Sequence, residues 1–139
     1  MNNTKRKDLI YPELSYNVTG CLYQVFNELG SNHREKYYQS AIAIELEKQN
    51  IKFEKELSFD LKYKDVVVGK NFIDFLIDSV LVLEIKVGSH FTKKSFDQIM
   101  DYLKTKHLKL GIIANFTNEG VKTHRVINFE EINNSNIRS

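Results

Sequence analysis

The 139-residue chain has one cysteine, one proline and no tryptophan. Because Cys21 has no possible partner within the chain, an internal disulfide is excluded, a thiolate metal cluster is not expected, and a reducing cytoplasm is the expected location. Its strictly apolar stretches are only a few residues long, far short of the roughly 20 residues that cross a bilayer. The first residues, MNNTKRKDLIYPEL, include basic residues but no apolar segment, so we expect no secretory signal.

The composition is that of a globular domain, with 42% hydrophobic and 27% charged residues. This length suits one domain with a real core. We therefore predict a single domain over residues 1–132, followed by a disordered tail over residues 133–139.

The basic residues concentrate in the second half of the chain, although the net charge is only +2. Residues 1–85 hold 11 Lys/Arg and 13 Asp/Glu, whereas residues 86–139 hold 9 and 5. This asymmetry permits a phosphate-binding face, and it is equally compatible with an ordinary lysine-rich surface.

The hydrophobic periodicity changes along the chain between the spacing of helices and that of strands. The expected helices span residues 12–29, 35–49 and 95–105. The expected strands span residues 52–63, 66–77, 80–87, 110–114 and 123–129. The resulting order, ααβββαββ, favours an α/β domain in which helices pack on a mixed sheet.

Charged side chains interrupt the segment FIDFLIDSVLVLEIKVG, residues 72–88, which is otherwise apolar enough to be buried. Burying an unpaired carboxylate is costly or raises its pKa. Because side chains alternate along a strand, Glu84 and Lys86 share one face. A three-residue loop at residues 78–80 would put Asp74 opposite Glu84, whereas a two-residue loop would put them on opposite faces.

Two carboxylates side by side would repel each other unless a divalent cation joined them. Mg²⁺ is commonly held by one or two carboxylates together with water and substrate phosphate. Lys86 beside such a cation would orient an attacking water or stabilise charge on the phosphate. The alternative is a structural salt bridge between Glu84 and Lys86, and the spacing alone leaves both open.

An Asp followed by Glu-x-Lys on the next strand resembles the core of the PD-(D/E)XK nuclease superfamily. The segment LGSNHREKYYQSAIAIELEKQNI resembles the signature of a small family in that superfamily, named for a G-x-x-E-x-x-Y pattern, and FIDFLIDSVLVLEIKV, QIMDYL and LGIIANF resemble its later blocks. The resemblance implies a restriction-endonuclease-like α/β core, with a mixed sheet flanked by helices. It also implies an endonuclease dependent on Mg²⁺ or Mn²⁺ that acts on nucleic acid, DNA in preference to RNA, with a homodimer as a further expectation.

Carried over by position, the resemblance assigns roles to individual residues. Catalytic roles fall on Glu35, Asp74, Glu84, Lys86 and Gln98. Metal-ligand roles fall on Asp74, Glu84, Glu35 and the Ile85 carbonyl. Substrate-binding roles fall on Tyr38, Tyr102, Lys93 and Lys94. The signature glycine is replaced by Asn32, and because Asn tolerates a left-handed backbone, we expect the turn to survive.

Each role outside the Asp–Glu–Lys set has a structural alternative. Glu35 suits the first turn of a helix, where the dipole favours an acid. Tyr38 and Tyr102 suit a core, and Gln98, Lys93 and Lys94 suit a solvated surface. For the whole protein, the alternative is a nuclease-fold module with little or no turnover that binds nucleic acid or a protein partner.

Overall fold

The computed structural model describes residues 10–138. The helices are α2 (Pro12–Leu29), α3 (Glu35–Lys48), α4 (Lys93–Lys106) and α5 (Phe129–Arg138). The strands are β1 (Phe53–Tyr63), β2 (Val66–Ile77), β3 (Leu81–Val87), β4 (Leu110–Thr117) and β5 (Gly120–Ile127). The order is the expected ααβββαββ with one helix added. No helix within residues 10–138 is long and apolar enough to cross a membrane.

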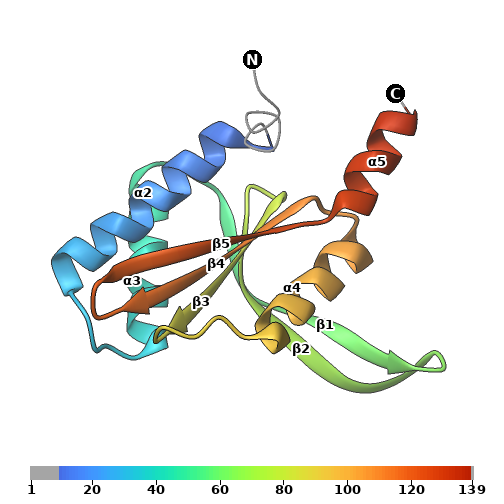
Figure 1. Cartoon of the computed structure of the whole chain (residues 1–139), viewed down its shortest axis with the longest axis horizontal. Helices are drawn as coiled ribbons and strands as arrows, with labels where there is room; N and C mark the ends of the chain where they lie inside the picture. The colour runs from blue at the N-terminus through green and yellow to red at the C-terminus, as the bar shows by residue number, and fades with distance from the viewer. Residues whose placement is uncertain (1–9, 139) are drawn as a thin grey trace.

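The strands form one sheet in the order β1-β2-β3-β4-β5 (Figure 1). Strands β3 and β4 are parallel, and the other neighbours are antiparallel. Parallel neighbours need a long crossover, and α4 provides it. The architecture is therefore the predicted α/β fold with a mixed sheet flanked by helices.

The sheet separates two apolar cores. The larger core lies against α2 and α3, and the smaller one lies against α4. Leu83 and Ile85 of β3 belong to the first core, whereas Val82 belongs to the second. Burial on both faces explains why LVLEIKV lacks the alternation of a half-exposed strand.

Helix α4 approaches the sheet most closely at Gly111 of β4. A Cβ atom at this position would lie 2.6 Å from the Cγ2 atom of Ile99 on α4. Any larger residue would therefore push the helix away from the strand. Glycine here sets the distance between α4 and the sheet.

The carboxyl-terminal segment corrects the sequence prediction of a disordered tail from residue 133, because α5 continues to Arg138. The Asn128 side chain caps the helix by accepting a 3.4 Å hydrogen bond from the Glu131 amide. Its own amide group donates to the Leu108 carbonyl at 3.0 Å. An Asn followed three residues later by Glu is a helix-start signal, and the sequence analysis did not use it.

We expect Gly111→Ala to destabilise the protein by about 1–3 kcal/mol, the usual cost of overpacking a core. Adding Ile99→Leu should recover part of that loss, because leucine has no Cγ2 branch at the point of contact. Melting temperatures by circular dichroism would measure both effects.

Gly20→Ala is the matched control, since no atom lies within 4 Å of its added Cβ. This change lies within a helix and should be neutral or stabilising. Equal melting temperatures for Gly111→Ala and Gly20→Ala would contradict the close approach of α4.

Candidate active site

The candidate site lies where β2 and β3 separate. Their ladder joins Ile77 to Leu81, Leu76 to Val82 and Phe75 to Leu83, and then ends. The loop between the strands has three residues, 78–80. The next pair in this register would be Asp74 and Glu84, as the three-residue loop predicted.

Side chains replace the backbone ladder at this point. The Asp74 amide donates to Oε1 of Glu84 at 3.0 Å, and the Ile85 amide donates to Oδ2 of Asp74 at 2.7 Å. Each carboxylate thus satisfies a backbone N–H of the opposite strand. We call this arrangement of Asp74, Glu84 and the Ile85 amide the carboxylate fork.

Burial raises the pKa of both acids. The pKa of Glu84 rises to about 8, first because its carboxylate is removed from water and second because the Asp74 charge is close. Burial also raises the pKa of Asp74, opposed chiefly by the hydrogen bond from the Ile85 amide. The fork therefore favours retention of a proton by the carboxylate pair in the absence of a cation.

Lys86 is the cation beside the fork. Its Nζ lies 3.8 Å from Oε2 of Glu84, and its side chain is about one-third exposed, compared with 6% for Glu84. Three predicted residues, Asp74, Glu84 and Lys86, are therefore brought together. The ammonium group reaches solvent, whereas the carboxylate does not.

Helix α3 supplies a residue that the sequence analysis missed. A hydrogen bond from the Gln39 side chain lowers the pKa of Asp74. Glu35 lies one helical turn earlier and so shares this face of α3. The four-residue spacing from Glu35 was the available signal for Gln39.

The comparisons with known proteins agree with this geometry. A family model of the PD-(D/E)XK nuclease superfamily matches residues 12–135. The chain belongs to this superfamily. Its members are generally nucleases and usually use divalent metal ions. Membership in the G-x-x-E-x-x-Y family stays a prediction.

Among solved structures, the chain is similar to the crystal structure of SSO0001, with a TM-score of 0.50 and 18% sequence identity. The alignment covers 88% of this chain but only 59% of that protein. This similarity shows a shared fold. No curated protein gave a significant match.

The turn before α3 is built by Asn32 and Tyr38. Asn32 has φ of 67°, which confirms the expected left-handed turn. The Tyr38 hydroxyl donates to the Gly30 carbonyl at 2.6 Å, and its ring stacks on Phe116 at 4.1 Å. The Tyr38 side chain is fully buried, so it positions the start of α3, and the structure leaves it no surface for substrate.

The Gln98 and Tyr102 pair on α4 also serves the fold. Gln98 donates from Nε2 to the Phe72 carbonyl at 2.6 Å, two residues before Asp74. Tyr102 is 3% exposed and packs edge-on against Phe59 at 5.2 Å. The predicted substrate contact of Tyr102 would need the α4 core to open, and a catalytic role for Gln98 stays a prediction.

The loop from Gly88 to Thr92 connects the strand of Lys86 to α4, and a side chain of β4 holds it by hydrogen bonds. Asn115 of β4 donates from Nδ2 to the carbonyls of Gly88 and His90 at 3.1 and 2.9 Å. A polar residue inside the buried strand LGIIANFT was the sequence signal for this role. Asn115 also pairs with Lys86 in the sheet register, so it fixes both the lysine's strand and the loop that follows.

Lys93 and Lys94 begin α4 beyond that loop, and both are exposed. Lys93 pairs with Asp97 at 2.7 Å. Their predicted contact with substrate therefore stays a prediction. Two grooves flank the fork, one at the end of β3 beside Asn32 and Lys122 and one between β1 and α4, and neither is lined by Asp74 or Glu84.

The donor set suits a cation of the Mg²⁺ type. The fork presents hard oxygen donors, and one oxygen of each carboxylate lies outside the backbone hydrogen bonds. Mg²⁺ takes one or two carboxylates plus water and phosphate. Within residues 10–138, no group of three or more His, Cys, Asp or Glu side chains is arranged to hold a metal. The role of Glu35 at the metal, directly or through water, stays a prediction.

In EDTA, the melting temperature should fall as pH rises from 4.5 to about 8. The folded state binds the Glu84 proton more tightly than the unfolded chain, whose ordinary pKa is 4.5. This contribution to stability is complete below pH 4.5 and lost above about pH 8. The upper limit is roughly 1.4 kcal/mol per pH unit.

Glu84→Gln should remove most of that pH dependence, because its amide oxygen can still accept from Asp74 but does not titrate. Calorimetry of both proteins across this range measures the difference. Identical pH profiles would mean that Glu84 is not protonated in the folded protein.

Proposed function

We propose that the protein is a metal-dependent nuclease that hydrolyses phosphodiester bonds, in DNA in preference to RNA and in the cytoplasm. The observation that carries this proposal is the carboxylate fork with Lys86 beside it. A core that served only stability would gain from apolar residues there, since buried acids of like charge are costly.

Asp74 and Glu84 would hold the cation, with the Ile85 carbonyl as a further ligand. When bound, a divalent cation lowers the pKa of water and offsets charge on phosphate. The two backbone hydrogen bonds hold the carboxylates in place before substrate arrives. The Gln39 side chain restrains Asp74 from the side of α3.

Lys86 would act on the reacting groups. Its Nζ is the exposed charge of the site, 3.8 Å from Oε2 of Glu84. From there it can orient water with an N–H or stabilise negative charge that builds on a phosphate oxygen. Glu35 would join through water, and Gln98 would keep α4 against β2 near Asp74.

A catalytically weak binding module is the second candidate, and one observation favours it. Glu84 is buried, and its carboxylate already accepts a hydrogen bond from the Asp74 amide and lies close to the Asp74 carboxylate. A fork that never opened to solvent would hold strands together without reacting. Metal-dependent cleavage separates the two functions.

A cleavage panel on single- and double-stranded DNA and RNA, with Mg²⁺, Mn²⁺ or EDTA, tests the proposal directly. We expect cleavage with metal and none with EDTA. Lys86→Met keeps an unbranched apolar stem without the charge and should lower the single-turnover rate by about 10²-fold or more. Its affinity for nucleic acid should change little, because the loss falls in the transition state.

Lys48→Met, on the exposed end of α3, is the matched control and should keep the full rate. A stable, fully active Lys86→Met would remove Lys86 from the mechanism. If the intact protein binds nucleic acid but cuts none of the substrates with either metal, the binding module is the better description.

Metal should also stabilise the folded protein, because a ligand that binds only the native state raises its stability. We expect Mg²⁺ or Mn²⁺ to raise the melting temperature, with a gain of about 2.7 kcal/mol at 100 times the dissociation constant. Asp74→Asn should reduce this gain. Asp65→Asn, in the β1–β2 turn, should retain it, and equal gains for both variants would rule out the fork as the metal site.

A further inference from the structure

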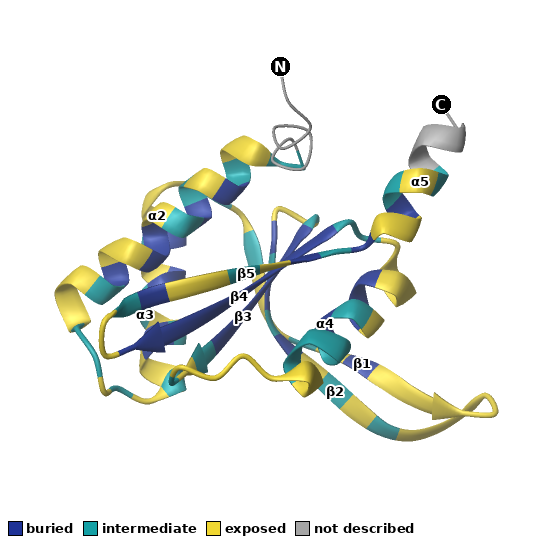
Figure 2. Ribbon diagram, viewed as in Figure 1, coloured by how far each residue is buried: buried dark blue, intermediate teal, exposed yellow. Residues whose placement is uncertain are grey.

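The β1–β2 hairpin carries apolar side chains that nothing in the described chain covers. Beyond α4 the two strands continue as an arm, residues 60–70, which projects from the body of the protein (Figure 1) and is largely exposed (Figure 2). Five large apolar residues of this arm are each 47–64% exposed: Leu61, Tyr63, Val66, Val67 and Val68. Exposed apolar side chains gathered on one projecting arm indicate an interaction site.

The outer edge of β1 is also free. Strand β1 is the first in the sheet order, so within residues 10–138 no strand pairs with that edge. It is 11 residues long, from Phe53 to Tyr63. An edge strand presents unpaired backbone N–H and C=O groups, which are a template for pairing with another strand.

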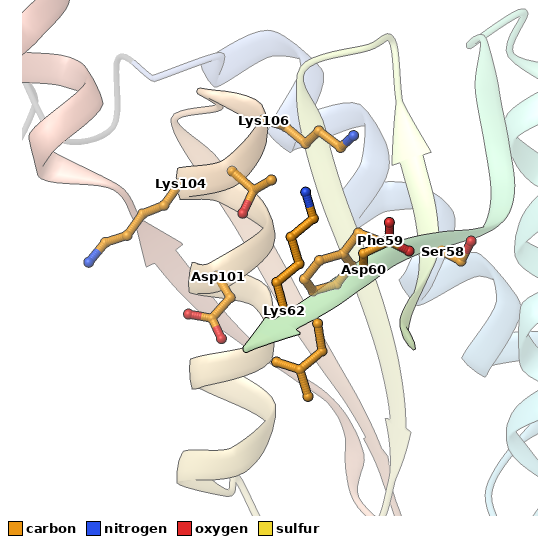
Figure 3. A pocket seen from close by; sticks show the side chains of 9 residues that line it. Ser58, Phe59, Asp60, Lys62, Asp101, Lys104 and Lys106 are labelled. Carbon is orange, nitrogen blue, oxygen red and sulfur yellow. The ribbon is translucent and has the colours of Figure 1, made fainter. Parts of the chain in front are cut away.

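A groove of about 560 Å³ runs between β1 and α4 beside this edge. Phe59 lies between the strand and the helix, whereas Lys104 points away from the strand (Figure 3). The lining carries both signs of charge, with Lys62, Lys104 and Lys106 beside Asp60 and Asp101. A polyanion would be repelled by the acids as well as attracted by the lysines, so it would bind this groove weakly. The groove better suits a segment that carries apolar side chains together with charges of both signs.

The β1 strand of a second copy of the protein is such an occupant. If two copies of Phe59–Tyr63 run antiparallel about a two-fold axis with Leu61 opposite Leu61, each Asp60 lies opposite Lys62 of the other copy. Opposite charges in directly facing positions stabilise a strand pair. In the same register Tyr63 lies opposite Phe59, and alternation puts both on the face toward the groove.

We propose that the protein forms a symmetric dimer by antiparallel pairing of the outer edges of β1, with Tyr63 of each copy entering the β1–α4 groove of the other. The pairing uses the same surface on both copies, so the assembly stops at two copies. It covers Leu61, Tyr63 and the free strand edge of β1 together. The proposal does not depend on nuclease activity, so either can fail without the other.

Sedimentation equilibrium of the full chain without nucleic acid tests the dimer. We expect dimers at micromolar concentration. Asp60→Lys or Lys62→Asp alone should weaken dimerisation by about tenfold or more, because two attractive pairs become two like-charge pairs. The double variant Asp60→Lys with Lys62→Asp should restore it.

Mixing the two single variants gives a sharper result. Each should be monomeric alone, but an equimolar mixture should form heterodimers, because one copy then has two lysines opposite two aspartates. Tyr63→Ser should also weaken the dimer. Tyr16→Ser, at a 79% exposed position on α2, is the matched control and should leave it intact.

Circular dichroism of each variant confirms that any loss of dimer is not a loss of fold. A monomeric wild-type protein at high micromolar concentration would overturn the proposal, as would single charge variants that still dimerise or a mixture that does not. A monomer whose nucleic-acid affinity falls with Lys62→Asp and rises with Asp60→Lys would make nucleic acid the occupant of the arm.

Discussion

Two hydrogen bonds between β2 and β3, from the Asp74 amide to Glu84 and from the Ile85 amide to Asp74, govern the geometry around the site. At the point where β2 and β3 separate, each carboxylate accepts an amide N–H from the opposite strand. Deleting either acid would leave a buried amide without a partner, which costs about 1–3 kcal/mol. The same bonds keep Asp74 of β2 beside Glu84 of β3, and alternation along β3 puts Lys86 on the face of Glu84.

Burying two acids in a strand pair lowers the stability of the folded protein, and packing elsewhere in the fold offsets this loss. The pKa of Glu84, raised to about 8, expresses that cost. The two apolar cores on opposite faces of the sheet provide the compensation, and the close contact of Gly111 with Ile99 locks α4 onto one of them. A local violation of the burial rules within a well-packed fold is the pattern expected of a functional site.

The residues to which the superfamily resemblance assigned roles form two groups, which differ in what their side chains contact. Asp74, Glu84 and Lys86 converge on one another and carry the chemistry that we propose. Tyr38 and Gln98 use their polar atoms on backbone carbonyls and hold α3 and α4 in place. A sequence pattern does not separate these groups, because a residue that orients a helix and one that touches substrate are equally characteristic of a motif.

The sequence by itself determined what depends on local spacing. Periodicity located the strands, and Asn32 could be expected to take a left-handed turn. The sequence left two loop lengths open between Asp74 and Glu84, and the structure decided for three residues. Helix α5 was missed although its capping signal at Asn128 was present. The contact of Gln39 with Asp74, the burial of Tyr102 and the unpaired edge of β1 were decided only by tertiary structure. These features depend on which elements pack together, and distances between residues remote in the chain follow from that packing rather than from spacing.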